Sequence, residues 1–293
     1  MKRILLFLVT NFAVMLVLML VFTLACKFLG LDTAMLAKDG INYDTLAVYS
    51  LVFGMSGSVI SLLLSKPMAK MSTGAKTIDG SEGPAERWLV DTVQYLADRA
   101  GIKRPEVAIY PGDPNAFATG AFKNSALVAV STGIMESMTK NELRAVLGHE
   151  MSHVSNGDMV TMTLVQGVLN AVVLFLSRAA GLILARDSRG RGRSNGMAYL
   201  VQMVLQIVLG IGASVVVYAF SRHREYKADA GSAQLLGSPS DMIAALRRLG
   251  NIQPGVLPDS LKAMGISGKS MRSLFSTHPS LEDRIAALQN LTA

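Results

Sequence analysis

Uncharged apolar blocks alternate with mixed polar segments along this chain. The blocks cover residues 4–26, 46–65, 159–176 and 197–220, and none of them contains Asp, Glu, Lys or Arg. A helix needs about 20 predominantly apolar residues to cross a bilayer. We therefore predict a mainly α-helical membrane protein with four transmembrane helices, one hairpin lying within residues 1–65 and a second within residues 159–220.

The first block has a rival interpretation as a secretory signal peptide. Signal peptides carry an apolar core of roughly 7 to 15 residues and a cleavage site made of small residues. The block at residues 4–26 is longer than such a core and follows directly on Lys2 and Arg3. We predict that it stays attached as a membrane span.

The polar segments, residues 66–158 and 221–293, have the pattern of a domain that lies outside the bilayer. Apolar residues recur at helical spacing between residues 85 and 101, where Gly101 is a typical stop signal. A further helix is predicted to begin after Thr139, because Thr139 followed by Glu142 fits a capping box.

The strands of this domain are short. Apolar runs at residues 106–110 and 126–130 predict two strands, and residues 115–122 between them predict an edge strand. Residues 72–85 are rich in Gly and Ser and predict a linker. The expected class is an α+β domain with a small sheet beside the membrane helices.

Basic residues near the span ends predict the orientation in the membrane. Lys2, Arg3, Lys66 and Lys70 place both ends of the first hairpin on the cytoplasmic side. The connection at residues 177–196 carries five arginines, which opposes an outside position for this loop. We favour a crossing hairpin because the fourth block is long and uncharged; the alternative is that neither of the last two blocks crosses.

An even number of crossings, in either case, keeps residues 66–158 and 221–293 in one compartment, the cytoplasm.

Overall composition agrees with a membrane protein, since 51% of the residues are hydrophobic and 17% are charged. The net charge of +7 does not predict nucleic-acid binding, because residues 66–158 hold 10 basic and 11 acidic side chains. A single cysteine, Cys26, excludes an intrachain disulfide and a cysteine-rich metal site.

Two of the four histidines form the strongest chemical pattern in the chain. His149 and His153 lie four residues apart on the predicted helix, so both rings share one face. Two imidazoles at this spacing bind one zinc ion, and Glu150 between them fits a general base that is not itself a ligand. The alternative is two helix-surface histidines in ordinary packing.

A catalytic zinc needs a third protein ligand, and Glu225 is the strongest candidate. Asp229 lies one helical turn further and would accept the free ring N–H of a ligand histidine, most favourably His149. This order of acids is typical of a gluzincin. His223 is a competing ligand, but it would lie on a different face of the helix. The non-catalytic alternative for Glu225 and Asp229 is that they form surface ion pairs with neighbouring basic residues.

The fourth histidine, His278, precedes Pro279 and a helix predicted to start near Ser280. Its functional interpretation is a donor to the reaction's oxyanion, with Arg284 nearby. Its structural interpretation is a residue before a helix with no chemical role.

These motifs together resemble the HtpX-type bacterial membrane metallopeptidases, which are relatives of the CAAX prenyl proteases. The resemblance rests on "HEMSH", "EYKAD", "THPSLEDRI" and "NAFATG", together with the four apolar blocks. It implies a zinc endopeptidase of the inner membrane, facing the cytoplasm, that degrades damaged or misfolded membrane proteins. It also implies His149, His153 and Glu225 as zinc ligands and Glu150 as the base.

The same resemblance implies roles for the remaining site residues. Asp229 becomes the acid that orients a ligand histidine. Asn115 and Ala116 would contact the substrate backbone along the "NAFATG" edge, and His278 with Arg284 would stabilise the transition state or orient the site. The expected partners are unfolded membrane-protein substrates and the lipid bilayer.

Three other functions compete with broad quality control. A peptidase that processes one defined membrane precursor fits the same residues. A transporter is disfavoured because the four apolar blocks contain no ionisable side chain. A zinc-binding scaffold without catalysis would need the ligands but would have no use for Glu150.

Overall fold

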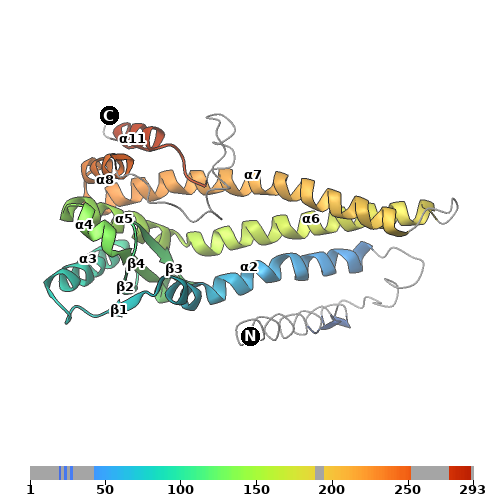
Figure 1. Ribbon diagram of the computed structural model, residues 1–293, viewed down its shortest axis with the longest axis horizontal. Helices are drawn as coiled ribbons and strands as arrows, with labels where there is room; N and C mark the ends of the chain where they lie inside the picture. Colours follow the sequence, from blue (N-terminus) through green and yellow to red (C-terminus); the bar gives the residue numbers. More distant parts are fainter. Residues whose placement is uncertain are drawn as a thin grey trace. The chain divides into compact units, whose positions relative to one another are not determined.

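The structure is a computed structural model that describes residues 43–188, 195–251 and 277–291, together with five isolated residues near the start of the chain (Figure 1). Those five are Leu20, Thr23, Leu24, Lys27 and Phe28. Apart from three of them, the first predicted span, residues 4–26, lies outside the described residues.

Three long apolar helices meet the length and composition of a membrane span within the described chain. They are α2 (Tyr43–Thr73), α6 (Asp158–Ser188) and α7 (Asn195–Leu236). Each contains one of the predicted blocks and extends beyond it, because a helix satisfies its own backbone hydrogen bonds and does not end where apolar residues end. Helix α7 continues past Phe220 without interruption and carries the predicted catalytic segment that follows.

Two predicted loops are partly regular, which corrects the sequence-based interpretation. The linker at residues 72–85 contains the end of α2 and a short strand, β1 (Lys76–Ile78). The connection at residues 177–196 is helical up to Ser188 and again from Asn195. Arg178 therefore lies inside a candidate span, Asp158–Ile183, with its guanidinium 4.3 Å from the ring centre of Tyr49.

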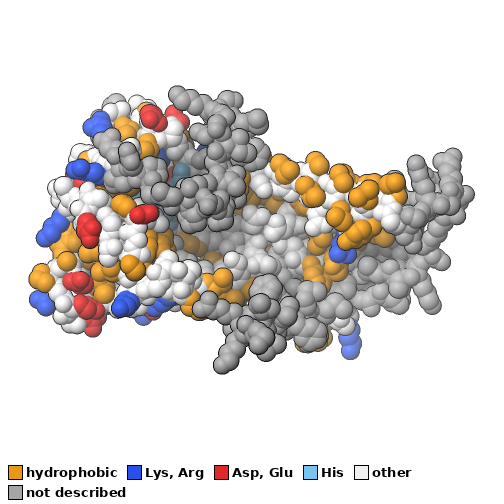
Figure 2. Space-filling view, viewed as in Figure 1, with side chains coloured by type: hydrophobic (Ala, Val, Ile, Leu, Met, Phe, Trp, Pro, Cys, Tyr) orange, Lys and Arg blue, Asp and Glu red, His pale blue; other side chains and the backbone are white. Residues whose placement is uncertain are grey.

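The chain divides into two compact units. The first comprises residues 1–60 and 163–214, and the second comprises residues 61–162 and 215–293. In the first unit, α2 and α6 approach closely at Gly54, where any added Cβ would overlap the backbone of Ala171. Hydrophobic side chains gather along the surface of these helices, whereas the acidic side chains visible in the same view lie on the second unit (Figure 2).

The second unit contains a four-stranded mixed sheet in the order β1-β2-β4-β3. Strand β2 (Glu106–Tyr110) runs parallel to β4 (Leu127–Ser131), and β1 and β3 (Ala116–Thr119) are antiparallel to their neighbours. The predicted strands are confirmed, including β3 as an edge strand. A short 3-10 turn, η2 (Lys123–Ser125), leads from β3 towards β4.

Helices pack on this sheet around the larger of two apolar clusters; the smaller cluster consists of Ala108, Tyr110, Leu127 and Ala129. Helix α3 (Pro84–Ala100) ends at Gly101 in the left-handed conformation (φ 65), as its sequence predicts. Helix α5 (Lys140–Asn156) contacts both α3 and β3, so it forms the centre of the unit. The remaining helices are α4 (Thr132–Ser137), α8 (Ser240–Asn251) and α11 (Leu281–Gln289).

Candidate active site

Helix α5 carries the two histidines and is fixed at both ends. At its start, the Thr139 hydroxyl accepts a hydrogen bond from the Glu142 amide, and the Glu142 carboxylate accepts one from the Thr139 amide at 2.8 Å. This confirms the predicted capping box. At its end, Gly157 adopts the left-handed conformation (φ 69), and its amide caps the last turn.

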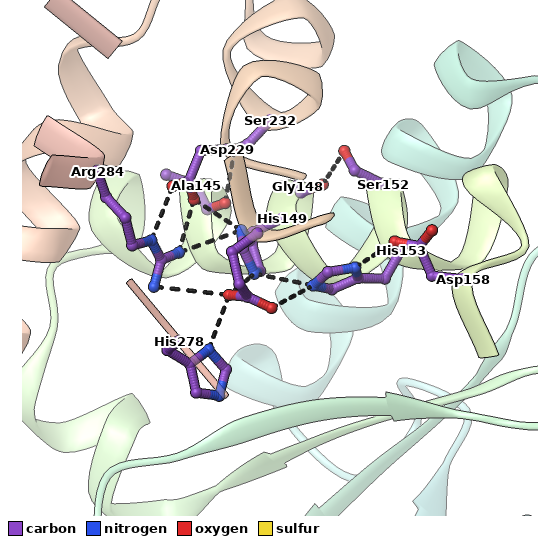
Figure 3. Close-up of polar contacts among 11 residues, drawn as sticks. Ala145, Gly148, His149, Ser152, His153, Asp158, Asp229, Ser232, His278 and Arg284 are labelled. Atoms are coloured by element: carbon purple, nitrogen blue, oxygen red, sulfur yellow. Dashed lines mark hydrogen bonds and ion pairs between the residues drawn. The ribbon is translucent and has the colours of Figure 1, made fainter. Parts of the chain in front are cut away.

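Small residues bring α7 close to α5. A Cβ at Gly148 would lie 2.7 Å from the Ser232 hydroxyl, and one at Gly231 would lie 2.5 Å from the Ser152 hydroxyl. The buried Ser232 hydroxyl also donates a hydrogen bond to the Ala145 carbonyl at 2.7 Å. This close approach places the carboxylates of α7 beside the histidines of α5 (Figure 3).

Three side chains converge with one donor atom each. The Nε2 atoms of His149 and His153 are 3.1 Å apart. The Glu225 Oε2 atom lies 3.5 Å from His149 Nε2, and the Glu225 Oε1 atom lies 3.4 Å from His153 Nε2. Zinc bonds of about 2.0 to 2.1 Å in a tetrahedral site separate neighbouring ligand atoms by roughly 3.3 Å. The three separations therefore fit a metal site.

The hydrogen bonds behind the histidines strengthen this fit. The Nδ1 atom of His149 lies 2.8 Å from Asp229, and that of His153 lies 2.6 Å from Asp158. With both Nδ1 atoms acting as donors, the two neutral rings turn their Nε2 lone pairs towards each other and towards a carboxylate. In this tautomer the three groups would suit a cation held between them.

The pKa values of the histidines respond to the same surroundings. Burial opposes the charged ring of His149, but hydrogen bonds to Asp229 and Glu225 outweigh it and raise the pKa. For His153, burial again opposes the charge, and hydrogen bonds to Asp158 and Glu225 raise the pKa to about 9. The surroundings of both rings therefore stabilise positive charge, which is what a metal ion supplies.

Asp229 occupies the position predicted for it and has a second partner. Its carboxylate is buried and receives Arg284 Nε at 2.7 Å and Arg284 Nη2 at 2.6 Å. Burial opposes the charge on this guanidinium, yet the hydrogen bond to Asp229 raises the pKa of Arg284 above its ordinary value. The Arg284 side chain thus acts on His149 through Asp229.

Asp158 is a site residue that the sequence analysis missed. It follows Gly157 directly, so the left-handed turn at the end of α5 returns its carboxylate to His153. Arg224 Nε, from α7, lies 3.1 Å from the other oxygen of Asp158. The available signal was an acid one residue after the glycine that ends the ligand helix.

Glu150 lies next to the candidate metal-ligand group without belonging to it. The group of side chains with suitable donor atoms in the described part of the chain is His149, His153 and Glu225. Burial of the Glu150 carboxylate raises its pKa, which the nearby histidines partly offset. The backbone amide of Ala118, on β3, also acts on this carboxylate. A carboxylate with a raised pKa beside a metal site suits proton transfer near neutral pH.

Asn115 and Ala116 lie at the open edge of the sheet. The Ser131 amide donates to the Asn115 carbonyl at 2.9 Å, so the backbone of Asn115 faces β4. Backbone groups alternate in direction along a strand, and those of Ala116 and Ala118 therefore face the unpaired side. This side of β3 is where Glu150 lies, and an extended peptide could pair there.

His278 contacts the candidate metal-ligand group. Its Nδ1 lies 2.9 Å from the Glu225 carboxylate, and its side chain is 63% exposed (Figure 3). Ser280 caps α11 by accepting from the Asp283 amide at 3.1 Å, as predicted for the helix after Pro279. The competing ligand His223 is exposed and lies outside the metal-ligand group formed by the described residues.

Comparison with known proteins agrees with this geometry. Residues 84–292 match the model of peptidase family M48. The chain is 58% identical over 294 residues to a protease HtpX homolog of Janthinobacterium sp. (strain Marseille), covering 99% of this chain and 100% of that one. It is 55% identical over 298 residues to one of Herminiimonas arsenicoxydans, with the same coverage of both chains.

The fold also has a solved counterpart. The crystal structure of S. mikatae Ste24p superposes with a TM-score of 0.63 at 17% sequence identity, over 98% of this chain. This chain spans 65% of the length of that structure, so the similarity concerns the shared fold. The family resemblance inferred from the motifs is confirmed: the chain belongs to peptidase family M48.

Proposed function

We propose that this protein is a zinc-dependent endopeptidase of the cytoplasmic membrane that hydrolyses misfolded or damaged membrane proteins. The observation that carries the proposal is the convergence of His149, His153 and Glu225 beside Glu150, with closest separations of 3.1 to 3.5 Å between two ring nitrogens and the two carboxylate oxygens. The chain that holds them has three described helices long and apolar enough to span a membrane. Family membership supports the reaction class.

The proposed ligands are His149, His153 and Glu225, with one zinc ion per chain. Two imidazole nitrogens and one carboxylate are a donor set that suits catalytic zinc. When bound, zinc polarises a carbonyl group and makes a water molecule more acidic. Asp229 and Asp158 hold the two rings in the tautomer that turns Nε2 inward.

Glu150 is the proposed general base. It would take a proton from the attacking water and deliver it to the nitrogen of the leaving amine. The substrate would lie extended along β3, with its backbone paired to Ala116 and oriented by Asn115. Because Ala118 adjoins both this edge and the Glu150 carboxylate, the scissile bond would be held close to the base.

His278 and Arg284 have different proposed roles. The ring of His278 stands beside Glu225 and would donate to the negative oxygen that develops in the transition state. Arg284 is buried and paired with Asp229, which favours orientation of His149 over direct contact with substrate.

Membrane topology is part of the proposal. Four crossings would put residues 66–158 and 221–293 together on the cytoplasmic side, with hairpins at residues 1–65 and 159–220. A Ser188→Cys substitution in a Cys26→Ser background, probed with a membrane-impermeant thiol reagent, tests it. Labelling in intact cells supports the crossing hairpin, and labelling only after lysis contradicts it.

The first experiment compares purified wild type with Glu150→Gln. We expect about one zinc per chain in both proteins and cleavage of an unfolded protein by wild type alone. Chelation should abolish that cleavage and added zinc should restore it. Equal cleavage by both proteins would contradict the assigned base, and zinc in both without any cleavage would leave a metal-binding scaffold.

A panel of substrates separates quality control from precursor processing. Cleavage of many unrelated unfolded membrane proteins at comparable kcat/KM supports quality control. Strong selection of one site in one protein, with the others uncleaved, would support the narrow processing peptidase instead.

A further inference from the structure

A recess of about 320 Å³ lies where α5 turns into α6. One wall consists of residues 120–123, which follow β3. The opposite wall comes from the end of α5 and the start of α6, between Val154 and Thr161. None of the roles assigned above uses this space.

The walls are apolar, and two of the residues that form them are glycines without side chains. Val154, Met159 and Val160 supply aliphatic and thioether surface. Gly120 and Gly157 have positive φ angles of 133 and 69, so the backbone conformation itself favours residues without side chains at two wall positions. A volume of roughly 300 Å³ is at the lower end of ligand sites in proteins, which suits a single large side chain.

The mouth of the recess carries one aromatic and one basic side chain. Phe122 lines the recess and is 67% exposed. The stem of Lys123 runs along Gly157, where an added Cβ would lie 3.3 Å from Lys123 Cε. Lys123 is the one charged residue among those that line the recess, so a cationic side chain entering it would meet a like charge.

Both walls continue directly from elements of the active site. Val154 follows the ligand His153, and Gly157 precedes Asp158, which holds the ring of His153. On the other wall, Gly120 follows Thr119, the last residue of β3. A peptide paired with the open edge of β3 would therefore pass the recess as it leaves the strand.

We propose that this recess is a selectivity pocket that receives one large apolar side chain, such as Leu, Met or Phe, of the bound substrate. The inference rests on the proposed peptidase function and adds a side-chain preference to backbone recognition by β3. The substrates it predicts are apolar segments of unfolded proteins, and Lys or Arg would be rejected at the position that faces the pocket.

The test uses purified full-length protein with zinc and a set of fluorogenic peptides in which each position is changed in turn. In wild type, one position should favour Leu or Phe over Gly or Lys by about 10- to 100-fold in kcat/KM. Ala121→Trp fills the recess, so this ratio should fall towards unity. Ala85→Trp, an exposed alanine on α3, is the matched control and should keep the wild-type ratio.

Zinc content and the thermal midpoint of each variant show whether it is folded. If Ala121→Trp does not fold, Val160→Ala enlarges the same recess and should shift the preference towards Phe and Trp peptides. The proposal is overturned by an unchanged ratio in a folded Ala121→Trp or Val160→Ala, or by a wild type without apolar preference at any position.

Two other results have separate meanings. In the first, Ala121→Trp changes kcat/KM by the same factor for all peptides, and the factor depends on added phospholipid. This result would overturn the proposal and assign the recess to a lipid chain. In the second, the Glu150→Gln variant cleaves the peptides at the wild-type rate. This result would contradict the proposed peptidase mechanism.

Discussion

Arg284 grips both oxygens of Asp229, with Nε 2.7 Å from one and Nη2 2.6 Å from the other. The two residues are 55 positions apart in the chain, and both are buried. Asp229 in turn lies 2.8 Å from His149 Nδ1, so α11 supports the proposed metal site without supplying one of its proposed ligands. A planar guanidinium matches a carboxylate in this two-point geometry, whereas an ammonium group does not.

Arg284→Lys should therefore weaken zinc binding by about 10- to 100-fold, the usual cost of losing a group that supports a ligand. Arg284→Gln, which removes the charge as well, should weaken it further. Competition with a chelator of known zinc affinity measures both values. Wild-type affinity in both variants would show that Asp229 orients His149 without help from Arg284.

Asp158→Asn should reduce zinc affinity by a similar factor of about 10 to 100, because the Nδ1 atom of His153 loses its carboxylate partner. The amide is nearly the same size, so the effect isolates the loss of charge. The same chelator competition applies, with Asp91→Asn on the exposed side of α3 as the control. Equal affinities for Asp158→Asn and Asp91→Asn would mean that His153 needs no such partner.

Gly54→Ala should lower the free energy of unfolding of the first compact unit, which contains Gly54 and Ala171, by about 1 to 3 kcal/mol, the typical cost of overpacking. The added methyl group would overlap the backbone of Ala171, which cannot move aside as a flexible side chain can. The midpoint of unfolding in mixed detergent micelles measures the change. Gly57→Ala lies on the same helix with open space around it and should unfold like wild type.

The pH dependence of stability should reflect Glu106. Its carboxylate lies 2.7 Å from both Lys66 and Lys70, and hydrogen bonds to these two lysines lower its pKa below the ordinary value of 4.5. Because the pKa of Glu106 is lower in the folded state, its ionised carboxylate stabilises the folded state at pH values above the unfolded-state pKa. This stabilisation is lost as the pH falls through the folded-state pKa.

Glu106→Gln should consequently lower the thermal midpoint at pH 7 and have no effect at low pH, where the wild-type carboxylate is protonated. The expected cost is at most about 1 kcal/mol, because the carboxylate side chain is 44% exposed and water screens the pairs. Glu136→Gln, at an exposed glutamate on α4, provides the control. A destabilisation that is equal at pH 7 and pH 3 would contradict the ionic explanation.

Local sequence patterns predicted the ligand helix well. The capping box at Thr139 and Glu142 and the spacing of His149 and His153 involve only neighbouring residues, so no tertiary information was needed. The pairing of His149 with Asp229 was also predicted, because a helix that carries Glu225 presents Asp229 on the same face.

Other features depend on contacts that no local pattern records. Strand β1 has three residues in a Gly- and Ser-rich stretch, and it exists because it pairs with β2 some thirty residues later. The role of Asp158 requires the left-handed turn at Gly157, which reverses the chain towards His153. The extension of α6 to Ser188 places Arg178 in a span, although residues 159–176 alone contain no charge.

Helix α7 limits how this enzyme could be divided into soluble fragments. It runs unbroken from Asn195 to Leu236, and its last third bears Glu225 and Asp229. A fragment from which the apolar residues are removed would have to cut this helix a few residues before Glu225, a proposed metal ligand. One residue inserted between Phe220 and Glu225 would turn the carboxylate about 100° around the axis. A fragment that lacks the apolar part of α7 would therefore also lose the helical turns that set the direction of the Glu225 carboxylate.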